Sequence, residues 1–111
     1  MKNYIIAVDF DGTLFTDEYP YIGEPIWSVI NFCKKARQEG DTLILWTCRC
    51  GDDLKEAVEA CKDVGLEFDY VNENSKEHMA KFNNQDTRKI YADVYIDDKM
   101  IDAKIIRSNI F

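Results

Sequence analysis

Two aspartates separated by one residue follow directly on an apolar run near the start of the chain. The run is Tyr4–Val8, and Asp9, Asp11 and Gly12 come after it. An apolar run of this length, rich in branched side chains, predicts a strand that is buried on both faces. Carboxylates at the end of such a strand are costly to desolvate unless something pairs with them, and a divalent cation such as Mg²⁺ is a usual partner. A metal-free Asp-Gly turn is the alternative for this stretch alone.

Two later strand ends also carry polar groups. Thr47 follows the apolar run Thr42–Trp46, and Asp97 and Asp98 follow the run Ala92–Ile96. In a parallel sheet the carboxyl ends of the strands lie on one edge, so we expect these groups to meet the first pair of acids. Each has a local alternative: the threonine could satisfy neighbouring backbone groups, and the two acids could form a turn.

Helical patterns stand between these runs. Pro25 suits the first turn of a helix that Gly40 ends, and Asp52 or Asp53 is expected to cap a second helix that ends at Gly65. Strands that alternate with helices predict an α/β fold.

The remaining segments are shorter or less regular. We expect a loop or small hairpin at 13–24, a third strand at 68–71, a polar and partly helical segment at 72–89 with a turn at Asn83 and Asn84, and an edge strand at Ile105 and Ile106. The sequence therefore predicts one domain over residues 1–111, a Rossmann-like doubly wound parallel sheet.

Composition limits the function classes. The chain has 111 residues, 46% of them hydrophobic, and a formal net charge of -7, which argues against non-specific nucleic-acid binding because that needs a basic face. No apolar run approaches the length that spans a membrane. The four cysteines lack zinc-ligand spacing and show no disulfide framework, and reduced thiols predict a cytoplasmic protein.

The expected strand edge has the chemistry of a phosphoryl site. Thr47 supplies a hydroxyl, the loop after it supplies free backbone N–H groups ahead of a helix, and Arg88 or Lys89 could supply a cation. An aspartate held against a metal-bound phosphoryl group can attack phosphorus, and a second carboxyl group two residues on can exchange protons with the leaving oxygen and with water.

In these motifs the sequence resembles the haloacid dehalogenase-like superfamily. Asp9-Phe10-Asp11-Gly12-Thr13 resembles its first motif, Asp-x-Asp-Gly-Thr, and Leu45-Trp46-Thr47 resembles its second, an apolar strand that ends in Thr or Ser. Lys89 falls where the third motif has a lysine, and Val94-Tyr95-Ile96-Asp97-Asp98 resembles the fourth, an apolar strand that ends in two acids. The motifs occur in the family's order over nearly the whole chain.

The resemblance implies a Mg²⁺-dependent phosphatase that forms an aspartyl-phosphate on Asp9. It implies that Asp11 is the acid/base and also places its carbonyl on Mg²⁺, with Asp98 as a direct metal ligand and Asp97 as the more distant acid, or the reverse. The implied catalytic residues are Asp9, Asp11, Thr47 and Lys89. The implied metal ligands are Asp9, Asp11, Asp97 and Asp98. The expected substrate-binding residues are Gly12, Thr13, Thr47, Cys48, Arg49 and Lys89.

Family members often carry a cap domain, and the gaps at 13–24 and 71–89 are too short for one. We therefore expect a capless enzyme whose phosphorylated substrate, a small molecule or a macromolecular end, is covered by that loop, by a second copy of the chain or by itself. Transfer of the phosphoryl group to an alcohol is an alternative to hydrolysis. The alternative outside catalysis is a receiver-like phosphoacceptor, or a non-catalytic regulatory domain on a similar fold.

Overall fold

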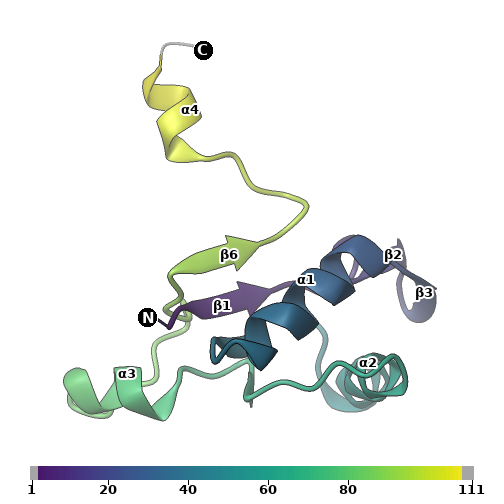
Figure 1. The fold of residues 1–111 in the computed structure, drawn as a ribbon, viewed down its shortest axis with the longest axis horizontal. Coiled ribbons are helices and arrows are strands. Elements are labelled where there is room, and N and C mark those ends of the chain that lie inside the picture. Colours follow the sequence, from purple (N-terminus) through teal and green to yellow (C-terminus); the bar gives the residue numbers. More distant parts are fainter. Residues whose placement is uncertain (1–2, 109–111) are drawn as a thin grey trace.

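A four-stranded parallel sheet forms the centre of the computed structural model, which describes residues 3–108 (Figure 1). Its strands are β1 (Ile5–Val8), β4 (Thr42–Leu45), β5 (Tyr70–Val71) and β6 (Val94–Ile96). They lie in the order β5-β4-β1-β6, so the chain builds the sheet outward from β1 and then returns to the other side of β1. The α/β class and the parallel sheet predicted from the sequence are confirmed.

β1 is the central strand because its side chains are apolar in both directions. Ile6 and Val8 on one face and Ala7 on the other are each at most 3% exposed. β1 pairs with β4 from Ile5↔Thr42 to Val8↔Leu45, and with β6 from Ile6↔Val94 to Val8↔Ile96. These registers bring the carboxyl ends of the three strands level with one another.

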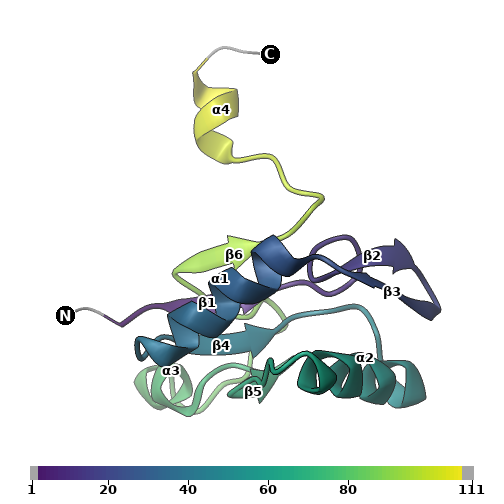
Figure 2. The same cartoon turned by 45° about the vertical axis from the view of Figure 1, so that its right-hand side comes forward.

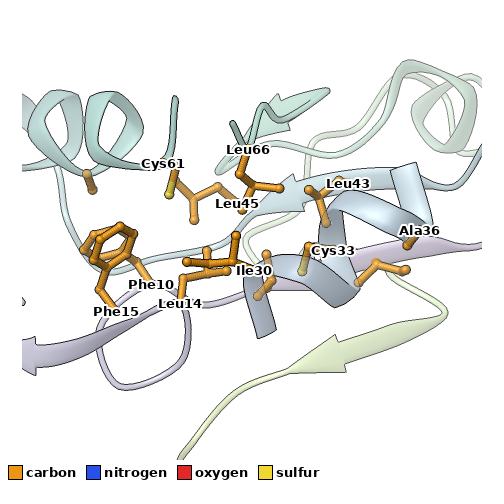
Figure 3. Close-up of a cluster of buried hydrophobic side chains, with 13 residues drawn as sticks. Phe10, Leu14, Phe15, Ile30, Cys33, Ala36, Leu43, Leu45, Cys61 and Leu66 are labelled. Atoms are coloured by element: carbon orange, nitrogen blue, oxygen red, sulfur yellow. The ribbon is translucent and has the colours of Figure 1, made fainter. Parts of the chain in front are cut away.

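The main core lies between the sheet and two helices, α1 (Trp27–Gln38) and α2 (Gly51–Asp63). Figure 3 shows Leu43 and Leu45 of β4 facing Ile30 and Cys33 of α1, with Cys61 of α2 beside them. Burial raises the pKa of the Cys33 thiol to about 11 and that of Cys61 to about 12, so both thiols behave as small apolar side chains.

A hairpin of β2 (Phe15–Glu18) and β3 (Tyr21–Pro25) connects β1 to α1. It confirms the small hairpin expected there. Gly12 precedes it with φ +81°, a conformation that glycine adopts without a steric penalty. Pro25 is the last residue of β3 and not part of the helix, because Leu14 accepts a hydrogen bond from Ile26 and extends the hairpin to that point.

The start of α2 also differs from the prediction. Its N-cap is Cys50, and Asp52 and Asp53 lie inside the first helical turn. Both acids still suit that position, because carboxylates near a helix N-terminus interact favourably with its dipole. The helix ends as expected, with Gly65 at φ +83°.

The segment between β5 and β6 contains α3 (Lys76–Lys81) and the expected turn, where Asn83 and Asn84 have φ of 56° and 58°. Asn74, which is 1% exposed, fixes the return of the chain to β6: its side-chain amide donates to Asp86, and its carbonyl oxygen accepts from the Tyr91 backbone at 2.8 Å.

The edge strand predicted at Ile105 and Ile106 is wrong. These residues lie in α4 (Ala103–Arg107), where Asp102 caps the helix by accepting from the Lys104 backbone. Local capping therefore outweighs the β-propensity of the two isoleucines. Figures 1 and 2 show α4 standing away from the sheet. None of the helices formed within residues 3–108 has the length and apolar character needed to cross a membrane.

Candidate active site

The strand register places two of the predicted acids side by side. Asp9 and Asp97 each follow a residue of the aligned pair Val8↔Ile96, and the Asp9 backbone donates to the Ile96 carbonyl at 2.9 Å. Carboxylate oxygens of Asp9, Asp97 and Asp98 all lie within 4.8 Å of one another. This three-carboxylate cluster (Asp9, Asp97 and Asp98) is the only group of three or more candidate metal ligands among residues 3–108.

The cluster has an electrostatic cost. Burial, together with the nearby Asp97, Asp98 and Asp11 carboxylates, raises the pKa of Asp9 from 3.8 to about 6, against the stabilising hydrogen bond from the Phe10 backbone. Asp97 and Asp98 are exposed, so water shares the cost of their charges. An arrangement of this kind favours a bound cation, which would neutralise the repulsion.

Gly12 allows the close approach of Asp98. A Cβ atom at position 12 would meet the Asp98 carboxylate, with its Oδ2 at 2.3 Å and its Cγ at 2.9 Å. The glycine therefore has two requirements to satisfy, a positive φ and an empty space beside the cluster. Gly12 was predicted to contact substrate; the structure shows that its lack of a side chain leaves room for Asp98.

A cleft of about 610 Å³ adjoins the cluster. Among the predicted residues, Asp9, Asp11, Thr47, Cys48, Arg49 and Asp97 line it. The remaining lining residues are Asp17 and Tyr19 from the hairpin, Trp46 at the end of β4, and Lys99. The Thr47 backbone donates to Asn72 Oδ1, and the Thr47 hydroxyl accepts from the Arg49 backbone at 3.1 Å. That contact is the local role considered for Thr47, and it leaves the hydroxyl hydrogen free to point at a ligand.

Asp11 does not join the three-carboxylate cluster because its carboxylate is bound by Arg49. The Arg49 Nε donates to Asp11 Oδ2 and its Nη2 to Asp11 Oδ1, both at 2.8 Å. This is a bidentate pair, and the Arg49 side chain is 1% exposed. The hydrogen bonds to Asp11 raise the pKa of Arg49 above its ordinary value.

Two of the predicted residues lie elsewhere. Lys89 is exposed, and its Nζ is 5.8 Å from the centre of the Tyr95 ring, outside the lining of the cleft. Arg88 lines a neighbouring hollow of about 340 Å³ that shares Trp46 and Thr47 with the cleft. Lys99 lines the cleft itself, together with Arg49, whose guanidinium is already paired with Asp11.

Lys99 was not among the residues predicted from the sequence to be functional. Its place directly after two acids was the available signal, and its backbone donates to Asp97 Oδ1 at 3.1 Å in the local turn that was the alternative for these acids. The turn and the cluster are therefore compatible.

Thr13 is 5% exposed, and its hydroxyl oxygen is the one buried side-chain polar atom among residues 3–108 that lacks a hydrogen-bond partner. It does not line the cleft, although it was predicted to contact substrate. The Thr13 backbone donates to the Phe10 carbonyl at 3.2 Å, so the residue is part of the tight turn that follows Asp9.

The donor set of the cluster fits a hard divalent cation. Carboxylate oxygens are the ligands that Mg²⁺ and Ca²⁺ take, and the cluster contains no nitrogen or sulfur ligand. Two of the three carboxylates are exposed, which leaves room for the water molecules that Mg²⁺ retains.

Comparison with known proteins gives one informative match. A solved structure of a conserved protein coded by a locus of Bacteroides thetaiotaomicron is 37% identical in sequence, with a TM-score of 0.76; the match covers 99% of this chain and 94% of that one. The chain belongs to the same family as this conserved protein. No known family model matches the sequence, and no curated protein does.

Proposed function

We propose that this protein is a Mg²⁺-dependent phosphatase that forms an aspartyl-phosphate on Asp9, as a capless member of the haloacid dehalogenase-like superfamily. The observation that carries the proposal is the three-carboxylate cluster at the end of β1 and β6, opening on the cleft that Thr47 lines. A nucleophile, a metal site and a hydroxyl donor at one strand edge are the parts that phosphoryl transfer through an enzyme carboxylate needs.

The strand order of the sheet supports a doubly wound Rossmann-like fold, and with it the position of the proposed site. In chain order the sheet strands lie 3-2-1-4, and the reversal of direction falls between β1 and β6. Ligands of open α/β sheets bind outside the carboxyl ends of the strands at such a reversal. Asp9 and Asp97 stand on the two sides of this position.

The reaction divides into two displacements. In the first, an Asp9 carboxylate oxygen bonds to phosphorus, the ester P–O bond breaks, and the leaving oxygen takes a proton from Asp11, which has first accepted that proton from solvent on a lone pair that Arg49 leaves free. In the second, water bonds to phosphorus and gives a proton to Asp11, and the P–O bond to Asp9 breaks, which releases inorganic phosphate. Asp9, Asp97 and Asp98 would hold Mg²⁺, which when bound supplies positive charge to the phosphoryl oxygens.

Thr47 and the cation are the expected phosphoryl-binding groups. The Thr47 hydroxyl is directed by its contact with the Arg49 backbone. For the cation we retain Lys89, as the motif order implies. The alternatives are Lys99, which lines the cleft, and Arg88, which lines the neighbouring hollow. An alanine substitution at each of the three positions would identify the cation by the largest rise in KM for substrate.

The two short connections of the sheet support the proposal that the enzyme is capless. Between β1 and α1 the chain forms only the β2–β3 hairpin, and between β5 and β6 the one helix is the six-residue α3. Substrate is therefore covered by the hairpin and by whatever part of the substrate or of a second copy of the chain lies over the edge. A phosphorylated small molecule or a phosphorylated macromolecular end fits such a site.

The order of the strands in the sheet argues against a receiver-like phosphoacceptor. The flavodoxin-like sheet of receivers has the strand order 2-1-3-4-5, which places the first strand between the second and the third. Here β1 lies between the second and the fourth sheet strands, β4 and β6. The strand before Thr47 also ends without an aspartate, and receivers carry the phosphorylated aspartate on a middle strand.

The test is release of phosphate from nitrophenyl phosphate by wild type and by Asp9→Asn, with Mg²⁺ and with excess chelator. We expect activity in wild type with Mg²⁺ alone, and loss of at least about 1,000-fold in Asp9→Asn, because an amide keeps the shape but cannot attack phosphorus. Glu59→Gln, which removes an exposed carboxylate in the middle of α2, is the matched control and should retain full activity. Turnover by Asp9→Asn at a tenth of the wild-type rate would show that Asp9 is not the nucleophile.

A further inference from the structure

Arg49 uses every hydrogen-bond donor it has inside the protein. Beyond its two bonds to Asp11, its Nη2 donates to the Tyr21 carbonyl at 3.0 Å, and its Nη1 to the carbonyls of Pro20 at 3.2 Å and Asp53 at 3.3 Å. A guanidinium has five N–H groups, so none remains for a substrate. The residue was expected to bind substrate, and its bonding indicates a different task.

The contacts of Arg49 join three parts of the site that are distant in sequence. They are the loop after β1 (Asp11), the turn of the β2–β3 hairpin (Pro20 and Tyr21) and the first turn of α2 (Asp53). The rings of Phe10 and Tyr19 complete the enclosure, with their centres 5.0 Å and 5.1 Å from the guanidinium carbon.

The arrangement separates the four acids of the site into two groups. Three carboxylates form the cluster, while both oxygens of Asp11 are held by Arg49 on the hairpin side. Asp11 nevertheless lines the same cleft as Asp9. A bidentate pair fixes the plane and the direction of a carboxylate, which a single hydrogen bond does not.

We propose that Arg49 is a positioning residue: it holds the Asp11 carboxyl group apart from the three-carboxylate cluster, at the leaving-group side of the cleft, and fastens the hairpin turn beside it. The inference rests on the proposed function, since it gives Arg49 a part in that reaction through Asp11. Arg49 contacts no reacting atom, and its effect on turnover passes entirely through Asp11.

A positioning role for Arg49 can be distinguished from a structural one by comparing substrates whose leaving groups differ in basicity. Proton donation by Asp11 matters for an alkyl phosphate, whose leaving oxygen is strongly basic, and matters little for dinitrophenyl phosphate, whose leaving group departs as an anion. The experiment measures kcat/KM for glycerol phosphate and for dinitrophenyl phosphate with Mg²⁺, in wild type, Asp11→Asn, Arg49→Lys and the double variant Asp11→Asn with Arg49→Gln. Arg49→Lys keeps the charge but loses the two parallel hydrogen bonds.

We expect Asp11→Asn to lose about 100-fold or more on the alkyl ester and less than about threefold on the aryl ester. Arg49→Lys should show the same selectivity, with a loss of about tenfold or more on the alkyl ester alone. The double variant leaves no charge of the pair unpartnered. Its ratio of kcat/KM between the two esters should equal that of Asp11→Asn, because removing Arg49 has no further effect once the carboxyl group that it positions is gone.

Arg37→Lys is the matched control. Arg37 donates through Nε and Nη2 to Asp69 at 3.4 Å and 3.2 Å, outside the lining of the cleft. Its ratio between the two esters should equal that of wild type.

Three results would distinguish a failure of the positioning role from a failure of the proposed phosphatase function. An equal loss on both esters in Arg49→Lys would overturn the positioning role, and so would a further change in the ester ratio of the double variant relative to Asp11→Asn. Failure of wild type to hydrolyse either ester would instead refute the phosphatase function itself.

Discussion

Replacing Asp9 by asparagine should make the metal-free protein more stable, although it removes the proposed nucleophile. Burial and the surrounding carboxylates raise the pKa of Asp9 from 3.8 to about 6. The pKa of this carboxyl group is higher in the folded protein than in the unfolded chain, so its ionisation lowers the free energy of unfolding. Stability therefore falls as the pH rises from about 4 through about 6, and the full loss is present at neutral pH. Asparagine carries no charge, retains an oxygen for the Phe10 backbone, and escapes this loss.

The gain in stability expected for Asp9→Asn follows from the raised pKa of Asp9. A rise of about two pKa units corresponds to about 3 kcal/mol at neutral pH. Asp9 is only partly buried, and screening by water and ions reduces the value to about 1–2 kcal/mol. For a domain of 111 residues this raises Tm by about 4–10 °C.

The assay is thermal unfolding of wild type and Asp9→Asn in excess chelator from pH 5 to pH 8, with Glu59→Gln as the control for net charge. We expect the gap between Asp9→Asn and wild type to be largest above pH 7 and to shrink towards pH 5, where folded Asp9 is mostly protonated. Glu59→Gln should follow wild type at every pH. Mg²⁺ should stabilise wild type more than the variant, because binding to the folded state adds to its stability.

One result would refute the reasoning. If Asp9→Asn were no more stable than wild type at pH 7.5 in chelator, the carboxylates of the cluster would not repel one another at the separations described. A stability gain that did not depend on pH would likewise show that ionisation of Asp9 is not its cause.

Three further predictions concern the phosphoryl intermediate, the turn and the core. Vanadate and beryllium fluoride should inhibit the Mg²⁺-dependent activity, because both mimic a phosphoryl group on Asp9; undiminished activity in their presence would contradict the intermediate. Gly12→Ala should destabilise the protein by about 1–3 kcal/mol and weaken Mg²⁺ binding measured by calorimetry, because the new methyl group would displace Asp98 and strain the backbone. Leu45→Ala should cost about 2–5 kcal/mol in chemical denaturation, because Leu45 is fully buried in the main core; a cost below about 1 kcal/mol would contradict that packing.

Local patterns were sufficient for most of the sheet. The apolar runs before Asp9, Thr47 and Asp97 predicted the three strands whose ends form the site, since a buried strand is specified by its own residues. The turn at Asn83 and Asn84 was predicted for a similar reason, because asparagine tolerates a positive φ. The tail was mispredicted as a strand because the capping bond of Asp102 competes with the two isoleucines and decides the local structure.

The sequence by itself therefore determined the strands and the chemical groups that stand at their ends. Only the tertiary structure decided how the four acids divide. The register of β1 with β6 brings Asp97 to Asp9, and no local pattern contains that register. Arg49 removes Asp11 from the cluster across 38 residues of sequence, which is possible because the hairpin turn and α2 supply carbonyl groups around a buried guanidinium. A buried charge is stable only where several distant segments meet to satisfy it, so its partners follow from the folded chain and not from the spacing of its residues.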